Sequence, residues 1–280
     1  MLSEYDLHSH SIYSDGHLSP QQLVLRAKNN GVQVLALTDH DSTNGLKEAR
    51  AVAKENNMRL INGVEVSCTW GGQTIHIVGL NIDAKQKPLQ KVLAKNQQFR
   101  VWRGKEIGRK LERCNVTNAY CETLKLVKGK LLTRSHYGEY LHQAGYVDSV
   151  QKAFKKYLLA GKKAHVKGQW ADIATVIEAI CNSGGIACIA HPKRYKMTNA
   201  KLNRLFGAFA DCGGRAIEVV GANSTASDVD YLAKCATRYR FLSSLGSDFH
   251  KPSAWAELGR LLPLPRGAKL FGSCSNGTKV

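Results

Sequence analysis

The stretch Asp6-Leu7-His8-Ser9-His10 places two histidines two residues apart near the start of the chain. A strand alternates its side chains between two faces, so we expect His8 and His10 to point to the same side. Asp15 follows in a turn with Gly16. Imidazole and carboxylate are ligands that zinc, manganese and iron accept in proteins. The opening stretch therefore predicts one wall of a metal site.

Further along the chain, short apolar runs alternate with segments of helical periodicity, which predicts an α/β fold with a parallel sheet or barrel. One helix start is well marked, because Ser19 can cap it, Pro20 fills its first position and Gln22 completes a capping box. The expected strands are Val32–Leu37, Leu60–Val66, Ile75–Leu80, Ile186–Ala190, Ala216–Val220 and Phe241–Leu245.

Most of these runs carry or end in further metal-ligand residues. They are found at Thr38-Asp39-His40-Asp41, Glu65, His76, His191-Pro192 and Gly246-Ser247-Asp248-Phe249-His250. In α/β barrels the carboxyl ends of the strands form the active face, where such residues converge. One histidine alone is explained as well by a local hydrogen bond, but three His/Asp clusters are not. Several carboxylates among histidines favour a multinuclear site, which suits phosphoryl transfer.

The positive charge is concentrated in the middle of the chain. The net charge of the 280 residues is +18, and residues 81–170 hold 20 of the 40 Lys and Arg but only 6 of the 22 acids. We call residues 81–170 the basic segment. Its composition predicts a separate surface for a polyanion, with nucleic acid favoured over a membrane. Helices are expected at 90–111, 134–144 and 150–159, with Phe99 and Trp102 in the core of this unit.

Cysteine usage and hydropathy predict a cytoplasmic protein. The cysteines at 68, 114, 121, 181, 188, 212, 235 and 274 include no CxxC pair, so we expect reduced thiols. No apolar run is long enough for a bilayer, and residues 1–5 lack the features of a signal peptide.

Taken together, the motifs resemble the PHP (polymerase and histidinol phosphatase) family. The matching motifs are Asp6–His10, Ser14–Gly16, Thr38–Asp41, Gly63–Glu65, His76, Ala190–Pro192 and Gly246–His250, in family order. The resemblance implies an α/β fold, a distorted (β/α)7-type PHP barrel with a small basic helical insertion. It divides the chain into a first barrel part (1–97), the insertion (98–162) and a second barrel part (163–280).

The resemblance also implies three divalent metal ions at the barrel mouth, with manganese favoured and zinc or iron as alternatives. His8, His10, Glu65 and Asp248 would hold the first ion. Asp15, His40 and His250 would hold the second, and Glu65, His76 and His191 the third, with Glu65 bridging. At Ser11 this chain departs from many relatives, which have threonine, but that position is not a ligand.

Within the family, Thr133-Arg134-Ser135-His136 and His191-Pro192-Lys193-Arg194-Tyr195 resemble the TrpH/YciV subgroup. This resemblance implies a 5′-to-3′ exoribonuclease that acts on RNA with a 5′-monophosphate and also hydrolyses nucleoside 3′,5′-bisphosphates, with a metal-bridging hydroxide as nucleophile. We expect Arg134 and Arg194 to hold the substrate phosphate, since guanidinium binds phosphate bidentately. His136, Lys193 and Tyr195 are further candidates.

Three other interpretations remain open at this point. The protein is a phosphatase of small nucleotide bisphosphates alone, a non-enzymatic RNA-binding assembly factor with a structural metal cluster, or a metal-dependent amidohydrolase. The full ligand set opposes the second, because structural sites need fewer ligands. An evident metal-bridging lysine is lacking, which opposes the third. No membrane and no obligate protein partner are expected. Glu218, on an expected strand, is a candidate for orienting a ligand, although an ordinary hydrogen bond is favoured.

Overall fold

The computed structural model describes residues 2–129, 131–253 and 256–272. The strands are β1 (Tyr5–Asp6), β2 (Val34–Leu37), β3 (Arg59–Trp70), β4 (Gln73–Leu80), β5 (Ala171–Asp172), β6 (Ile186–Ile189), β7 (Ala216–Gly221) and β8 (Leu242–Gly246). The helices are α1 (Pro20–Asn29), α2 (Leu46–Glu55), α3 (Lys87–Glu112), α4 (Ala119–Leu124), α5 (Arg134–Gln143), α6 (Val150–Ala153), the π-helix η1 (Phe154–Leu158), α7 (Ile173–Asn182), the 3-10 helix η2 (Pro192–Arg194), α8 (Asn199–Asp211) and α9 (Ala226–Tyr239).

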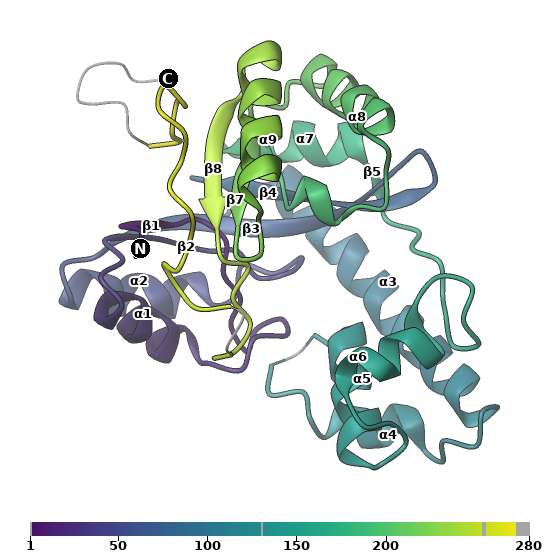
Figure 1. The fold of residues 1–280 in the computed structure, drawn as a ribbon. Coiled ribbons are helices and arrows are strands. Elements are labelled where there is room, and N and C mark those ends of the chain that lie inside the picture. The colour runs from purple at the N-terminus through teal and green to yellow at the C-terminus, as the bar shows by residue number, and fades with distance from the viewer. Residues whose placement is uncertain (1, 130, 254–255, 273–280) are drawn as a thin grey trace.

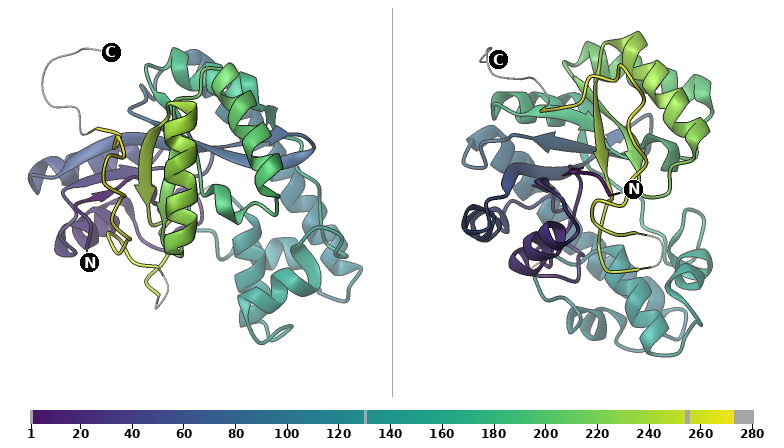
Figure 2. Two further views of the ribbon diagram at one scale, coloured as in Figure 1. Left: turned by 45° about the horizontal axis from the view of Figure 1, so that its top comes forward. Right: turned by 60° about the vertical axis from the view of Figure 1, so that its left-hand side comes forward.

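The strands form a nearly closed, barrel-shaped sheet, which confirms the predicted α/β barrel. Its order is β1-β2-β3-β4-β6-β7-β8, with β5 paired to β3. The two ends approach each other where the Leu7 amide donates to the Leu245 carbonyl at 2.9 Å. Helices cover the outside, with α1 and α2 on one flank and α7, α8 and α9 on another (Figures 1 and 2).

The sheet is not wholly parallel, and in this respect the prediction is wrong. Strand β4 runs antiparallel to both β3 and β6. The reason is the tight connection at Gly71 and Gly72, whose φ angles of 53° and 73° suit a hairpin turn. This hairpin places Glu65 of β3 and His76 of β4 on neighbouring strands.

One predicted element ends earlier than expected, and a second changes its helix type. Strand β1 stops at Asp6, so His8 and His10 lie beyond it, although Ser9 still forms a parallel bridge with Phe249. The helix expected over 150–159 is α-helical only to Ala153 and continues as the π-helix η1. The capping box at Ser19 is confirmed, since its side chain accepts from Gln22 while Gln22 bonds back to it.

Helix α3 joins two apolar cores. Its first half contributes Leu89 and Leu93 to the barrel core, while Ile107 and Leu111 belong to a smaller core with α5 and η1. The helix is continuous across the expected domain boundary at residues 97 and 98. The core interpretation of Trp102 is wrong, because its side chain is 51% exposed.

Two sequence-level expectations concern the whole chain. Among the described residues, no helix has both the length and the apolar character that a membrane crossing requires. The described cysteines are free thiols, and Cys274 lies outside the described residues.

Candidate metal centre

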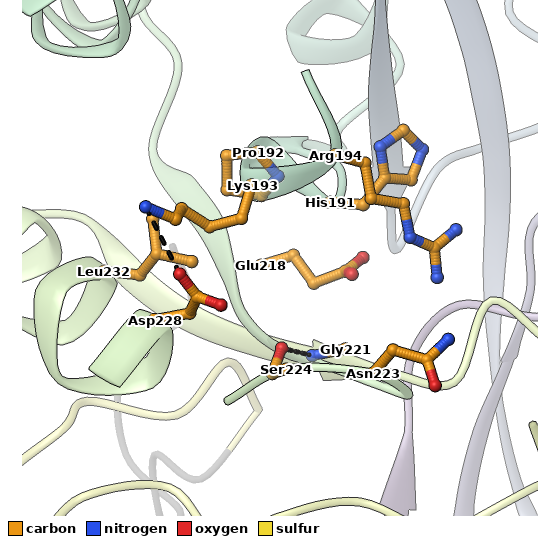
Figure 3. Close-up of a pocket in the computed structure, with 10 residues that line it drawn as sticks. All are labelled: His191, Pro192, Lys193, Arg194, Glu218, Gly221, Asn223, Ser224, Asp228 and Leu232. Atoms are coloured by element: carbon orange, nitrogen blue, oxygen red, sulfur yellow. Dashed lines mark hydrogen bonds and ion pairs between the residues drawn. The ribbon is translucent and has the colours of Figure 1, made fainter. Parts of the chain in front are cut away.

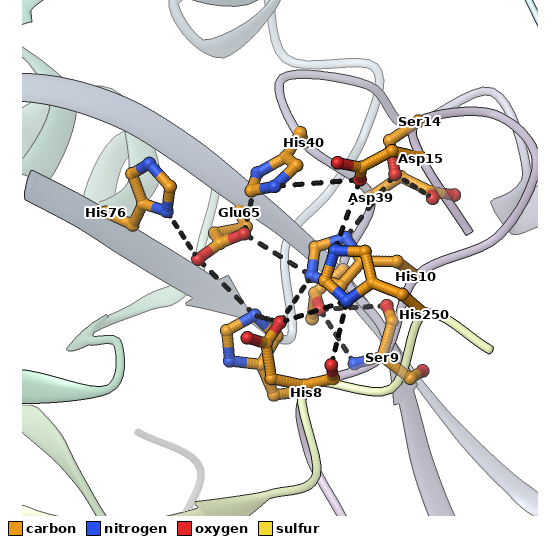
Figure 4. A network of polar contacts seen from close by, with 12 residues as sticks. His8, Ser9, His10, Ser14, Asp15, Asp39, His40, Glu65, His76 and His250 are labelled. Carbon is orange, nitrogen blue, oxygen red and sulfur yellow. Dashed lines mark hydrogen bonds and ion pairs between the residues drawn. The ribbon is translucent and has the colours of Figure 1, made fainter. Parts of the chain in front are cut away.

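The nine predicted metal ligands come together at one mouth of the barrel (Figure 4). His8, His10 and Asp15 follow β1, His40 follows β2, and His191 follows β6. Glu65 and His76 lie within β3 and β4, and Asp248 and His250 follow β8. Carboxyl ends of parallel strands meet at one edge, which explains how residues distant in sequence converge.

Three overlapping groups of ligand atoms have the spacing that a metal ion needs. The atoms of each group lie within 4.8 Å of one another. The groups are His10, Asp15, His40 and His250; His8, His10, Glu65 and Asp248; and His40, Glu65 and His76. The third group differs from the set that the resemblance implies for the third ion. It contains His40 beside Glu65 and His76, where the resemblance implies His191. The Nε2 atom of His191 is nevertheless 3.0 Å from Glu65 Oε1.

Unusual backbone conformations help to direct these side chains. His191 and Asp248 have φ angles of 30° and 51°, in the left-handed region that non-glycine residues rarely adopt. Gly246 packs so tightly on His8 that an added Cβ would lie 2.3 Å from the His8 Cβ. A glycine is therefore required at that position for the chain of β8 to pass beside the first ligand.

The donor set fits divalent metal ions. Several buried ligand atoms have no hydrogen bond, although buried polar atoms are normally bonded. They are His8 Nε2, Asp15 Oδ1, His40 Nδ1, Glu65 Oε2 and His191 Nδ1. Some lie at ion-pair distance without hydrogen-bond geometry, as His40 Nδ1 does at 2.7 Å from Glu65 Oε2. Buried carboxylate oxygens and imidazole nitrogens that lack a hydrogen bond are suited to coordinate a cation together.

The protonation of the carboxylates suits metal binding. Burial alone would raise the pKa of Glu65, but His40, His76 and His8 hold it well below its usual range. The pKa of Asp15 is lowered in the same way, mainly by His250 and His40 against the effect of burial. Both groups are therefore ionised at neutral pH and available as ligands.

The histidines divide into two kinds. Burial, with His250 and His40 nearby, lowers the pKa of His10 to about 3, so this ring is neutral. Burial would lower the pKa of His250 too, but Asp15 and Asp248 raise it to about 10. A protonated imidazole must lose its proton to bind a metal, so a metal ion bound at His250 would displace a proton.

Buried polar residues that are not ligands hold the centre in place. Glu218 on β7 is 3% exposed, and its Oε2 lies 2.7 Å from His8 Nδ1. Asp39 accepts hydrogen bonds from both Ser11 and Ser14, so Ser11 supplies the hydroxyl that threonine would also offer. The sequence signal for Glu218 was a charge on an expected strand, which suggested a ligand-orienting role as the less favoured alternative; that its partner is His8 was not predicted.

A second network ties the loop after β2 to helix α3. Asp41 has an ion pair of 2.6 Å with Arg100 and accepts a hydrogen bond of 2.8 Å from Asn96. Both partners are buried on α3. Asp41 follows His40 directly, so the basic segment reaches the metal centre through this contact.

The five predicted phosphate-binding residues do not lie in one place. Arg134 begins α5 and lines a small cavity with Arg100, Arg103 and Thr133. Thr133 in turn donates a hydrogen bond to Asp15 at 3.1 Å, so this cavity borders the metal centre. No hydrogen bond or ion pair of the Arg134 side chain is found within the described part of the chain; its guanidinium lies over the Phe154 ring, 5.9 Å from the centroid.

Like charges crowd this small cavity. Burial, followed by Arg134 and Arg100, lowers the pKa of Arg103 to about 9. Burial and Arg100 also lower the pKa of Arg134. The space between them is only about 10 Å³, so an anion that relieved this repulsion would also have to displace the side chains around it.

Lys193 and Arg194 line a different cavity, on η2 (Figure 3). Lys193 forms an ion pair with Asp228 at 3.3 Å, and Arg194 pairs with Asp248.

His136 and Tyr195 both make structural contacts. Thr133 donates its amide to His136 Nδ1 at 3.1 Å in the capping box of α5. The Tyr195 hydroxyl accepts the His76 amide at 3.0 Å, which fixes the strand that carries this ligand.

Comparisons with known proteins agree with this geometry. The family described as PHP domain matches residues 6–220. A 5′-3′ exoribonuclease of Haemophilus influenzae is 47% identical over 264 residues, covering 94% of this chain and 96% of the relative. A 3′,5′-nucleoside bisphosphate phosphatase of Chromobacterium violaceum is 37% identical over 252 residues, covering 90% and 88%. The solved structure of an amidohydrolase from Chromobacterium violaceum with bound sulfate has a TM-score of 0.91 at 36% identity, covering 95% of this chain and 93% of that one.

Proposed function

This chain belongs to the PHP domain family, and on that premise we propose that it is a metal-dependent 5′-to-3′ exoribonuclease. Its substrates are RNA with a 5′-monophosphate and nucleoside 3′,5′-bisphosphates. The observation that supports this most is the position of Arg134, a guanidinium without a carboxylate partner among the described residues, in a cavity that borders the metal ligand Asp15.

The nine ligand residues would hold three divalent ions, with manganese favoured. Such ions would provide a water of lowered pKa as nucleophile and neutralise charge on the phosphoryl oxygens. Asp15, which pairs with His40 and His250, borders the Arg134 cavity through Thr133. His8 and Asp248 border the cavity of Lys193 and Arg194 through their contacts with Glu218 and Arg194. Glu218 orients His8 from behind.

Arg134 would hold the terminal 5′-phosphate, which the enzyme does not hydrolyse. The phosphorus attached to the 3′-oxygen of the same nucleotide then lies at the metal centre. Water attacks this phosphorus, the bond to the 3′-oxygen breaks, and that oxygen takes up a proton. A bisphosphate yields a 5′-monophosphate and inorganic phosphate. RNA yields a 5′-monophosphate and a chain that keeps the attacked phosphate as its new 5′ end, ready for the next cycle.

A substrate panel with added manganese tests the proposal. It contains 5′-phosphate RNA, 5′-hydroxyl RNA, matched DNA, a nucleoside 3′,5′-bisphosphate and a peptide amide. We expect turnover of the 5′-phosphate RNA and of the bisphosphate, and its loss in Asp248→Asn or His10→Ala. Hydrolysis that survives these substitutions in metal-controlled buffer would contradict the metal mechanism. Turnover of the bisphosphate without RNA would support the narrower phosphatase, and amide cleavage would support the amidohydrolase.

The role of Arg134 has its own test. In Arg134→Ala, kcat/KM for 5′-phosphate RNA should fall by about 10- to 100-fold, as expected for the loss of a charge-assisted hydrogen bond to phosphate. Cleavage of 5′-hydroxyl RNA should change little. Arg113→Ala, an exposed arginine after α3, is the matched control. An unchanged preference for the 5′-phosphate in Arg134→Ala would place the phosphate site elsewhere.

A further inference from the structure

A cavity of about 120 Å³ opens beside the metal centre between η2 and the start of α9. It is lined by Lys193, Arg194, Glu218, Asn223, Ser224 and Asp228, together with His191 of the metal centre (Figure 3). A water molecule occupies about 30 Å³ of liquid volume, so this space is on the order of a single sugar ring.

The cations of this cavity are already neutralised. Lys193 pairs with Asp228, and Arg194 pairs with the Oδ2 atom of Asp248. The other oxygen of Asp248, Oδ1, faces His10 and His8 at 3.0 and 3.3 Å. Asp248 can therefore keep Arg194 on one side while it serves the metal centre on the other. With Glu218 also present, the cavity offers no excess positive charge for a phosphate, in contrast to the Arg134 cavity.

The cavity instead offers unused hydrogen-bonding atoms. Glu218 Oε1 is buried and has no hydrogen-bond partner among the described residues, while Oε2 is engaged with His8. An ionised carboxylate oxygen can only accept a hydrogen bond, so its partner on a ligand must be a donor such as a hydroxyl group. At the rim, the exposed Asn223 has no side-chain hydrogen bond within the described ranges. Ser224 fixes this loop by accepting the Gly221 amide at 2.8 Å.

The two cavities border different groups of metal ligands. The Arg134 cavity reaches Asp15 through Thr133. The second cavity reaches His8 through Glu218 and Asp248 through Arg194. A substrate whose 5′-phosphate lies at Arg134 and whose scissile phosphorus lies at the centre therefore continues toward the second cavity.

We propose that this second cavity binds the ribose of the nucleotide that follows the scissile phosphate, with Asn223 and the free oxygen of Glu218 as its polar contacts. This inference rests on the proposed function. The site is used only by RNA, because a nucleoside 3′,5′-bisphosphate has no group beyond the scissile phosphorus. It is thus a specificity site that favours RNA over the small substrate.

The experiment compares Asn223→Ala with wild type on two substrates, a 5′-phosphorylated dinucleotide and a nucleoside 3′,5′-bisphosphate. We expect kcat/KM for the dinucleotide to fall about tenfold, the loss expected for one or two hydrogen bonds. The bisphosphate should change by less than about twofold, which also shows that the variant is folded. Asn199→Ala, an exposed asparagine at the start of α8, is the control and should change neither value.

A second form of the dinucleotide sharpens the assignment. With 2′-deoxyribose in the second position, the activity of wild type should fall. The activity of Asn223→Ala should fall less, because the substitution and the missing hydroxyl remove the same contact between Asn223 and the ribose. Equal losses on both substrates in Asn223→Ala would assign the cavity to the first nucleoside, and no loss on either would leave it without a role; both outcomes overturn the inference. A wild type that hydrolyses only the bisphosphate also overturns it while the phosphatase activity stands, whereas a wild type that hydrolyses neither substrate refutes the proposed function itself.

Discussion

Glu218 is a buried carboxylate that contacts the candidate metal ligand His8 without belonging to the candidate ligand set. Its Oε2 lies 2.7 Å from His8 Nδ1, which leaves His8 Nε2 facing Glu65 and Asp248. A carboxylate behind a ligating histidine fixes the tautomer of the ring and raises its basicity. The geometry at His8 is of this kind, because the ring is 1% exposed and has no freedom to turn.

The substitution Glu218→Gln tests this role. The amide can still accept from the ring but loses the negative charge, so we expect manganese affinity to fall by about 10- to 100-fold. Metal titration by calorimetry, in competition with a chelator, measures the change. Asp228→Asn, in the same cavity but paired with Lys193, is the control and should bind metal normally. Unaltered affinity in Glu218→Gln would show that the contact with His8 does not matter for the metal.

At this scale the sequence predicts ligands better than their supports. His8 and His10 are recognisable because their spacing is local and their chemistry is specific. Glu218 is not, since its partner His8 lies 210 positions away and only the closed barrel brings the two together. Arg134 and Arg194 look alike in sequence, and only the structure shows that Arg194 is paired with a carboxylate while Arg134 faces two more arginines.

At the scale of elements, the sheet departs from the pattern that its sequence suggests. An apolar run such as Ile75–Leu80 does not reveal strand direction, because a buried strand has the same apolar pattern whether it pairs parallel or antiparallel to its neighbours. The glycine pair at 71 and 72 was the available signal for a hairpin. The contact of Asp41 with Arg100 was not predictable either, because it depends on where α3 crosses the loop after β2.

Helix α5 is held against the barrel mouth by one carboxylate. Glu139 Oε1 accepts from His17 Nε2 at 2.7 Å and from Lys251 Nζ at 3.0 Å. Burial alone would raise the pKa of Glu139, but the hydrogen bonds from His17 and Lys251 lower it from 4.5 to about 2. A carboxylate whose pKa is lower in the folded protein than in the unfolded chain stabilises the fold at pH values above the unfolded-state pKa. This contribution is lost as the pH falls through the folded-state pKa.

We therefore expect Glu139→Gln to lower the free energy of unfolding by about 1 to 2 kcal/mol at pH 7, a value discounted because the His17 and Lys251 side chains are both partly solvent-exposed. The difference from wild type should shrink as the pH falls from about 4.5 toward about 2. Urea unfolding across this range measures it. Glu122→Gln, whose ion pair with Lys125 lies on the surface of α4, should cost less than about 0.5 kcal/mol. A difference that is constant with pH would mean that Glu139 acts through packing and not through its charge.

At the scale of the whole molecule, the charge divides between two parts of the chain. The basic segment carries +14 of the +18, whereas the metal centre is built from residues outside it. Several contacts join the two parts at the mouth, among them those of Asp41 with Arg100, Asp15 with Thr133, and Glu139 with His17. Under the proposed function, a polyanion attracted to the basic segment would be brought beside the nearly neutral barrel, where its ester bond would be cut.

This division predicts different salt dependence for large and small substrates. Lys155, Lys156 and Lys163 are exposed in and after η1, and none pairs with a carboxylate among the residues described. Their joint replacement by glutamine should weaken binding of long RNA. It should also reduce the slope of log K against log salt by about 0.7 for each phosphate of the single strand that the variant no longer neutralises. Hydrolysis of a nucleoside bisphosphate should be spared, because that substrate is bound at the mouth alone.

Fluorescence anisotropy with labelled 5′-phosphate RNA at several salt concentrations measures the slope, and kcat/KM for the bisphosphate is measured alongside. The control replaces Lys28, Lys47 and Lys54, three exposed lysines of α1 and α2, which removes the same charge from the opposite part of the chain. If both triple variants reduce the slope equally, RNA responds to net charge alone. If the first variant loses equal activity on RNA and on the bisphosphate, these three lysines serve the catalytic mouth directly, as proposed for Arg134, and their separate role in attracting RNA is wrong.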